Sequence, residues 1–250
     1  MNSEKLQKEH FDKIMTQYEM HYDDYWSQKF RSEFVYKYLF RGQSLAGKFV
    51  LEAMCGSGQT TEHLLSKGAT VTGLDISSEA ISSFRSRWPT CTALCASILD
   101  SKLPDNAFDC VVVMGALHHM HPHVSQTISE IHRVLKPGGY FCFSEPTTGS
   151  LSDICRNWWY KCDRKFFAEN EAAIDLGNLK KEYSSQFEFI SETYLGNIAY
   201  LLVFNSLIFR IPLKLKGMYS PLLLKLERVI SPFQGKVLSC YATSQWKKKP

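Results

Sequence analysis

The chain has 250 residues, 44% of them hydrophobic and 22% charged, which is typical of a globular protein long enough to bury a substantial core. This length predicts one large domain, or a domain with a small appendage. Eight cysteines lack Cys-x-x-Cys spacing, and the polar N-terminus does not resemble a signal peptide. We therefore expect reduced thiols and a cytoplasmic location, and not a disulfide framework.

The net charge of +4 is unevenly distributed. Residues 180–250 contain 11 Lys and Arg against four Asp and Glu, or +7, which leaves −3 for the rest. A basic C-terminal part is compatible with nucleic acid, anionic lipid or an acidic substrate. The commoner interpretation is a solvated face that ends in the tail Lys247, Lys248 and Lys249.

The N-terminal residues 1–41 are rich in aromatic and charged side chains and contain neither Pro nor Gly. They predict one or two amphipathic helices. Most of their aromatic rings are expected to cover one face of a sheet.

A strand followed by a glycine turn is the pattern at the start of residues 48–75. The apolar run from Phe49 predicts a strand buried on both faces of a parallel sheet, stopping at Glu52. Gly56 and Gly58 then let the backbone turn sharply and approach a ligand without a Cβ in the way.

A helix over 59–67 and a second buried strand over 69–74 are expected next. Asp75 ends this strand where a nucleotide ribose would present its hydroxyls. A dinucleotide fingerprint needs a third glycine where this chain has Thr61, and the acid Glu52 before the turn would repel a phosphate. The pattern therefore predicts a nucleoside cofactor with a cationic or amine-bearing part.

The alternation of strands and helices continues after Asp75. Ser77 is a plausible N-cap, and the loop from Gly115 to His119 follows a strand end, where ligands bind in open α/β sheets. The expected elements are a helix over 78–88, strands over 92–96, 110–114 and 140–144, and a helix over 124–135.

The turn at Gly56 and Gly58 resembles motif I of the class I S-adenosylmethionine-dependent methyltransferases, usually an acid followed by Gly-x-Gly-x-Gly. One departure is Met54, which takes the first glycine position. The run from Arg133 through Val-Leu-Lys-Pro-Gly-Gly is similar to the small-molecule branch, of the ubiquinone and menaquinone pathway type. The resemblance covers residues 48–145.

This resemblance implies an α/β fold: a Rossmann-like, seven-stranded, mostly parallel sheet with helices on both faces, an antiparallel closing hairpin and helical insertions forming a lid. The whole chain would be a single methyltransferase domain. Its expected parts are an N-terminal helical lid over 1–45, a cofactor-binding core over 46–146, a helical insertion over 147–186 and closing strands over 187–250.

The resemblance also implies S-adenosylmethionine as the cofactor. Arg31 would pair with its carboxylate, and Tyr25 would reach the same methionine end. Ser97 stands where the family has an acid and would accept from the adenine amine, while Ile98 packs on the ring. The implied cofactor-binding residues are Tyr25, Arg31, Glu52, Ala53, Cys55, Gly56, Gly58, Asp75, Ile76, Ser97, Ile98 and Met114.

Catalysis should depend mainly on positioning, because the methyl group of this cofactor is already activated. A general base is needed only for an alcohol, a phenol or a carbon acid. The candidates are His118, His119 and Glu145, with His119 preferred because the loop should aim one of the pair at the cleft. The equally weighted alternative is that both imidazoles only shape the pocket.

A metal site is the other interpretation of the nearby histidines, at positions 118, 119, 121 and 123. Their spacing offers neither a Cys partner nor a helical i, i+4 pair, and Pro122 interrupts it. Methyl transfer from an activated donor needs no metal, so none is expected.

The closing strands of the sheet are expected over 187–194 and 237–242, with a helix over 222–230 opened by Ser220-Pro221. The apolar run 198–209 is shorter than the roughly 18 residues that span a bilayer. It fits a lid over the substrate, an interfacial helix or a dimer contact, in that order. Peripheral membrane contact through 198–235 is thus the second interpretation.

The acceptor is expected to be a small molecule methylated on oxygen or carbon. No Asn/Asp-Pro-Pro-Tyr signature is present, which disfavours nucleic acid. The apolar insertion favours a hydrophobic acceptor, and a glycan or natural product stays open. A methyltransferase that acts on a lipid or quinone at a membrane surface is an alternative. Two other classes remain: a catalytically silent cofactor-binding protein of the same fold, and a nicotinamide oxidoreductase. The second is disfavoured because Thr61 takes the place of the third glycine of the dinucleotide fingerprint.

Overall fold

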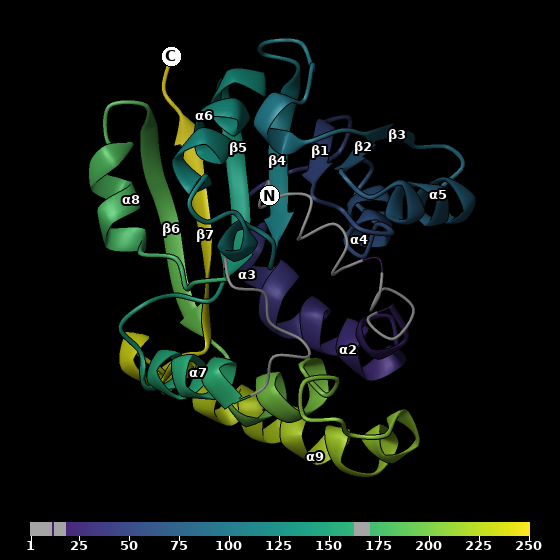
Figure 1. The fold of residues 1–250 in the computed structure, drawn as a ribbon, viewed down its shortest axis with the longest axis vertical. Coiled ribbons are helices and arrows are strands. Elements are labelled where there is room, and N and C mark those ends of the chain that lie inside the picture. The colour runs from purple at the N-terminus through teal and green to yellow at the C-terminus, as the bar shows by residue number, and fades with distance from the viewer. Residues whose placement is uncertain (1–11, 13–18, 163–170) are drawn as a thin grey trace.

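The structure, a computed structural model, describes residues 12, 19–162 and 171–250 (Figure 1). A seven-stranded sheet runs through the centre of the molecule, with helices on both faces. The strand order is β3-β2-β1-β4-β5-β7-β6, and β7 runs antiparallel to both β5 and β6 while the other neighbours are parallel. The predicted fold class is confirmed.

The elements follow one another along the chain as expected for alternating strands and helices. The strands are β1 (Phe49–Ala53), β2 (Thr70–Asp75), β3 (Thr92–Cys95), β4 (Phe108–Met114), β5 (Leu135–Glu145), β6 (Phe187–Leu195) and β7 (Tyr241–Lys248). The helices are α2 (Tyr25–Phe30), α3 (Lys37–Leu39), α4 (Thr61–Ser66), α5 (Ser78–Arg87), α6 (Val124–Val134), α7 (Leu151–Cys162), α8 (Leu176–Glu182) and α9 (Leu213–Ile230). Two π-helical segments, η1 (Arg31–Tyr36) and η4 (Tyr200–Phe204), complete the set used below.

The central strands are buried on both faces because their side chains alternate between two apolar cores. Val50 and Val112 lie in the core formed with α2, α4 and α5, whereas Leu51 and Val111 lie in the core formed with α6 and α8. This explains why the apolar runs predicted the strands.

The switch in strand order lies between β1 and β4. From β1 the chain proceeds outward through β2 to β3 and then crosses back to β4. Parallel strands on either side of such a switch leave a crevice at their carboxyl ends, which is where open α/β sheets bind ligands.

The helices predicted for the N-terminal residues are confirmed over the part of that segment that the structure describes. α2, η1 and α3 run on without a break from residue 25 to residue 39, and Asp24 caps the start by accepting from the backbone amide of Trp26. The remainder of the predicted helices falls partly on residues 1–11 and 13–18, outside the described residues.

The predicted last strand is wrong in position. Val237 and Leu238 belong to a short 3₁₀ helix and are exposed, and the strand is β7 instead. The sequence of β7 lacks an apolar pattern, because several of its buried residues are polar. Their polar groups are paired inside the protein: the side-chain amide of Gln245 donates to the backbone carbonyls of Leu39 and Arg41. Of the predicted solvated tail Lys247–Lys249, Lys249 is exposed, whereas Lys248 donates to the carbonyls of His132 and Leu135 at the end of α6.

The predicted start of the last helix is also wrong. α9 begins at Leu213 behind Pro212, and Pro221 lies inside it. A proline removes one backbone hydrogen bond from a helix. Here the turns before it are fixed by the buried side chains of Lys216 and Ser220.

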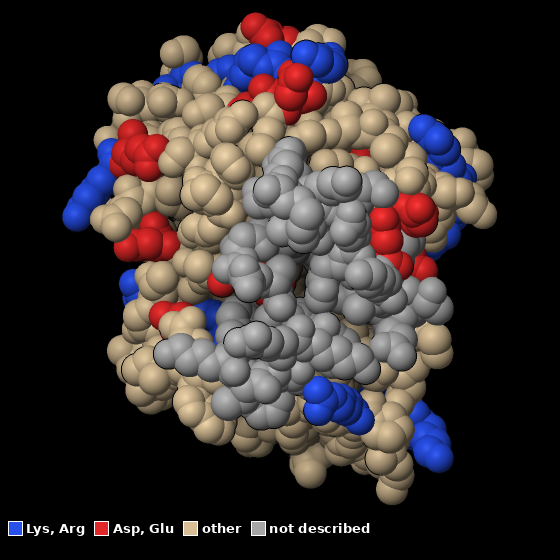
Figure 2. All heavy atoms as spheres, in the orientation of Figure 1, with Lys and Arg blue, Asp and Glu red and all other residues tan. Residues whose placement is uncertain are grey.

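Charge is distributed unevenly over the surface, as the sequence indicates. In Figure 2, the coloured charged side chains at the lower end of the visible face, where α9 lies, are Lys and Arg, whereas side chains of both signs are mixed higher up. Among the described residues, none of the helices is both long and apolar enough to cross a membrane.

Candidate functional site

The glycine turn after β1 follows the path that the motif predicts. Gly56 and Gly58 take positive φ angles of 55° and 84°. Met54, at the motif's first glycine position, also takes a positive φ, of 54°, which glycine adopts without strain and other residues do not. The turn thus keeps the form of the motif despite this substitution.

Glu52 is buried at the end of β1, and its carboxylate closes the turn onto α4. It accepts from the backbone amide of Thr60 at 2.9 Å and from the hydroxyl of Thr61 at 2.5 Å. Burial raises the pKa of Glu52 to about 7, although the hydrogen bonds from these threonines act in the opposite direction. A cationic ligand nearby would favour its charged form.

Asp75 lies at the end of β2 beside the same turn. Its carboxylate accepts from the amide of Gly56 at 2.8 Å and from the amide of Ser77 at 2.9 Å. The predicted neighbours Ala53 and Cys55 have buried side chains, and Ile76 is partly buried. The structure therefore brings the ends of β1 and β2 together at the turn.

Ser97 and Ile98 follow β3 in the order expected. The Ser97 hydroxyl accepts from the amide of Leu99 at 3.0 Å and so caps a short 3₁₀ helix, while Ile98 is buried in the core on the α6 side. Both lie at the carboxyl end of the strand next to β2.

Arg31 is buried in η1 and is aimed at the turn. Its guanidinium donates to the side-chain carbonyl of Gln59 and, at 3.2 Å, to the backbone carbonyl of Tyr22. It lies over the ring of Phe204 at 5.1 Å from the centroid. Among the described residues no carboxylate lies within ion-pair distance of this arginine, which suits a site for an anionic group.

Tyr25, by contrast, is not brought to the site. It is 66% exposed on α2, where it contacts Trp26 and Lys29. Tyr22, one turn earlier, is buried and lies beside Arg31. The aromatic signal was present in the sequence, but no local motif fixed which ring turns inward.

His118 and Glu145 form a hydrogen-bonded pair at the ends of β4 and β5. Nδ1 of His118 lies 2.7 Å from Oε2 of Glu145. The same carboxylate accepts from the amides of Ala116 and Leu117 at 2.9 and 2.8 Å. Burial, followed by the nearby charge of His119, lowers the pKa of His118 below 6.5 despite this carboxylate, so its imidazole is neutral near pH 7.

His119 lies against His118, with ring centroids 3.9 Å apart, and its Nδ1 is 3.1 Å from Oε1 of Glu171. The segment that carries Glu171 is held there because Ala172 donates to the His118 carbonyl. Donor atoms of His118, His119 and Glu171 lie within 4.8 Å of one another. No pattern in the sequence pointed to Glu171, and the expected absence of a metal stays a prediction.

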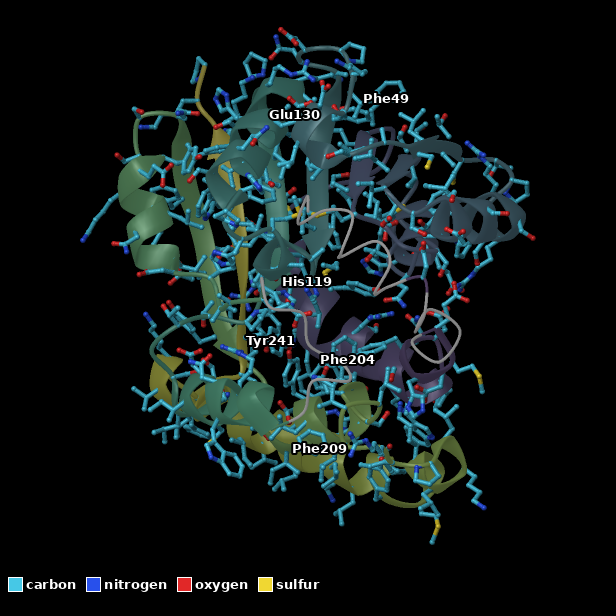
Figure 3. The ribbon with its side chains drawn as sticks, in the orientation of Figure 1. Phe49, His119, Glu130, Phe204, Phe209 and Tyr241 are labelled. Atoms are coloured by element: carbon cyan, nitrogen blue, oxygen red, sulfur yellow. The ribbon has the colours of Figure 1, made fainter. Side chains whose placement is uncertain are left out.

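A cavity of about 730 Å³ extends from His118 and His119 to α7, η4 and the residues that follow η4. Of the predicted site residues, Arg31, Met114, His118 and His119 line it, and Glu145 lies at its wall. In Figure 3, Tyr241, Phe204 and Phe209 follow one another from His119 toward α9. The other apolar lining residues include Val35, Ile154, Trp158, Tyr200, Leu201, Leu207 and Ile208.

Residues 51–143 match the methyltransferase-domain family. The methyltransferase resemblance predicted from the sequence is therefore confirmed. The match covers β2 to β4, most of β1 and β5, the glycine turn and the histidine loop.

Related proteins agree with this assignment. An uncharacterised methyltransferase from Synechocystis is 43% identical over 144 residues, 53% of this chain and 64% of the relative. A fatty-acid O-methyltransferase from Mycolicibacterium smegmatis is 35% identical over 103 residues, 40% of this chain and 37% of the relative. The alignments thus span less than two thirds of these relatives' own length.

A solved structure extends the likeness to the whole fold. Magnesium protoporphyrin IX methyltransferase from Synechocystis, with bound S-adenosylhomocysteine, superimposes with a TM-score of 0.66 over 99% of this chain and 100% of its own. The two sequences are only 13% identical, so this comparison concerns the fold alone.

Proposed function

We propose that this protein is an S-adenosylmethionine-dependent methyltransferase that acts on a hydroxyl group or an acidic carbon of a largely apolar small molecule. The observation that carries the proposal is an apolar cavity that extends from Arg31 and Gln59, the residue after the glycine turn, to the His118–Glu145 pair.

The residues at the turn fit the cofactor. Asp75 lies where the ribose hydroxyls would be bound, and Gly56 and Gly58 keep the turn free of side chains. Arg31 is a buried cation with no described carboxylate partner, which suits the carboxylate of the methionine part. The cofactor supplies an activated methyl group, and the chain has to orient the acceptor toward it.

The protein's own chemical contribution is proton removal by His118. With Nδ1–H donating to Glu145, Nε2 is left to accept a proton from the acceptor. Glu145 is a positioning residue, because backbone amides and the His118 ring already occupy its oxygens. His119, preferred from the sequence, shares the cavity and is the second candidate for the base.

The acceptor's chemistry is proposed from the lining. Aromatic and branched aliphatic side chains of α7, η4 and the residues after η4 form much of the lining, beside the polar Ser152, Arg156 and Asn205. This mainly apolar wall favours an acyl or other hydrocarbon portion. That a relative is named a fatty-acid O-methyltransferase agrees with this class.

Calorimetric titration with S-adenosylhomocysteine, in parallel with NADH, tests the proposal. We expect micromolar binding of the former alone, weakened between about 5-fold and 150-fold in Asp75→Ala, since one strong hydrogen-bonding group is lost. Asp109→Ala is the matched control, because that aspartate lies near the opposite ends of the strands and accepts from the amide of Phe49.

Binding of NADH but not S-adenosylhomocysteine would assign the turn to an oxidoreductase. Tight binding of S-adenosylhomocysteine without methyl transfer to any of a panel of long-chain alcohols, carboxylic acids and phenols would instead favour the catalytically silent protein.

A further inference from the structure

The outer face of α9 is apolar and open to solvent. Met218 is 81% exposed, Leu222 69% and Val229 60%. The exposed apolar residues of this helix are Leu215, Met218, Leu222, Leu226 and Val229. At 3.6 residues per turn they fall within an arc of about 80°, which makes one continuous stripe along the helix.

The inner face of the same helix carries the charged residues Lys216 and Glu227 beside the apolar Leu224, which is unusual for buried positions. Lys216 is buried and bonds to the carbonyl of His21 and the carboxylate of Asp24. Glu227 is buried and accepts from the amides of Asn197 and Ala199, both at 2.9 Å. These contacts prevent the helix from rolling to bury its apolar stripe.

Neighbouring segments enlarge this apolar surface. The residues after α9 expose Phe233, Val237 and Leu238. α7 lies beside them because the hydroxyl of Ser152 donates to the carbonyl of Ser239 (Figure 1). α7 itself exposes Leu151, Ile154 and Trp158. Separate exposed apolar residues are ordinary, but a contiguous group of this extent marks an interaction site.

The cavity described above opens within this surface. Ile154, Trp158, Leu201 and Phe209 are exposed to solvent and also line the cavity. They therefore form its rim, so whatever covers the apolar surface also faces the entrance.

The charges around the stripe are mainly basic, although Arg228 pairs with Glu33 and the buried Lys216 pairs with Asp24. Residues 198–239 contain six Lys and Arg and a single acid, Glu227, which is buried. Lys214 and Lys225 are exposed and, by helical geometry, lie next to one edge of the stripe. An apolar stripe flanked by lysines is the arrangement of helices that lie in the interface of an anionic bilayer.

From this geometry we infer that the outer face of α9, with the adjoining residues of α7 and 231–238, docks on an anionic lipid surface and presents the cavity rim to it. Docking itself is independent of the proposed function. Its consequence, that an apolar acceptor enters the cavity from the lipid, rests on the proposed function.

Flotation with vesicles tests the docking. The full chain should float with phosphatidylcholine vesicles that contain about 30% phosphatidylglycerol, bind pure phosphatidylcholine much more weakly, and dissociate in high salt. Leu222→Glu/Val229→Glu should lower the partition coefficient about 10-fold or more. Phe49→Glu is the matched control, since Phe49 is similarly exposed at the opposite end of the molecule (Figure 3).

The charge contribution is tested separately. Lys214→Gln/Lys225→Gln should weaken binding to the anionic vesicles about 30-fold, whereas Lys67→Gln/Lys102→Gln, which removes two exposed lysines elsewhere, should not. All variants alter exposed side chains, so their unfolding curves and S-adenosylhomocysteine affinity should match those of the parent.

The inference is overturned if the parent stays unbound with every vesicle, or if the stripe variant floats as the parent does. A dimer that Leu222→Glu/Val229→Glu converts to a monomer, without vesicle binding, would assign the face to a second copy of the chain. Vesicle binding without affinity for S-adenosylhomocysteine would remove the proposed function and keep the docking site.

Discussion

At the scale of single residues, the acids at the strand ends have a common role. Glu52, Asp75 and Glu145 end or nearly end β1, β2 and β5, and each accepts from backbone amides of a turn beside the crevice. Charged acceptors bound to backbone amides make strong hydrogen bonds. These carboxylates therefore fix the turns that would hold the cofactor and the base.

His118→Ala is expected to lower kcat about 100-fold or more, because proton removal by a positioned imidazole is lost, while the affinity for S-adenosylhomocysteine stays within about 3-fold. The pKa of His118 is lowered by burial, so the parent rate should fall with acidification only below about pH 6.5. Rates between about pH 5 and 9 measure both effects.

His123→Ala is the control for this prediction, since that histidine is not among the cavity-lining residues. Full turnover by His118→Ala, or an acid limb centred above about pH 7, would contradict the role of His118 and leave His119 as the candidate.

At the scale of elements, the sequence predicted the strands and helices whose buried side chains are apolar. β1 to β4 and α6 carry alternating or periodic apolar residues, and their positions match to within a few residues. β5 begins earlier than predicted, at Leu135 and not at Tyr140. β7 was misplaced because Thr243, Ser244 and Gln245 are buried by hydrogen bonding and pairing inside a sheet. The start of α9 was misplaced because the buried residues of its first turns, Lys216 and Ser220, are polar and Pro221 is typical of a first-turn residue.

The glycine turn allows a prediction with an internal control. A Cβ at Gly58 would lie 2.5 Å from Nε1 of Trp88 and 2.8 Å from the ring of Phe84, whereas a Cβ at Gly56 would meet open space. Gly58→Ala should destabilise the protein by about 2–4 kcal/mol, through overlap added to backbone strain, and Gly56→Ala by about 1 kcal/mol through strain alone.

Urea unfolding of both variants measures the difference. Equal losses of stability would show that the neighbours of Gly58 move aside, and that strain alone explains the need for glycine in this turn.

At the scale of the whole molecule, the cavity is assembled from segments that are far apart in the chain. Its wall includes Tyr22 and Arg31 near one end of the sequence and Tyr241 near the other. Phe30 stacks on Phe204 with centroids 5.3 Å apart, which joins α2 to η4. The sequence could place motifs on strands, but it held no signal for these distant contacts, nor for the approach of Glu171 to His119.

Among the residues that the structure describes, two ion pairs join the N-terminal helices to α9, and they should differ in strength. The pair of Lys216 with Asp24 is buried on the lysine side, and Lys216 also donates to Ser27. The pair of Arg228 with Glu33 is largely exposed. Lys216→Met should lower the free energy of unfolding by about 2–3 kcal/mol, because Asp24 and a carbonyl lose their partner in a buried setting.

Glu33→Gln, which breaks the exposed pair between the same segments, should change stability by less than about 1 kcal/mol. Because α2 leads directly into Arg31, Lys216→Met should also weaken binding of S-adenosylhomocysteine, while Glu33→Gln should not. Chemical unfolding and calorimetry of the two variants provide the comparison. Similar effects of both substitutions would mean that α9 is held by its apolar contacts, such as those of the buried Leu224, and that the buried lysine contributes little to the position of the N-terminal helices.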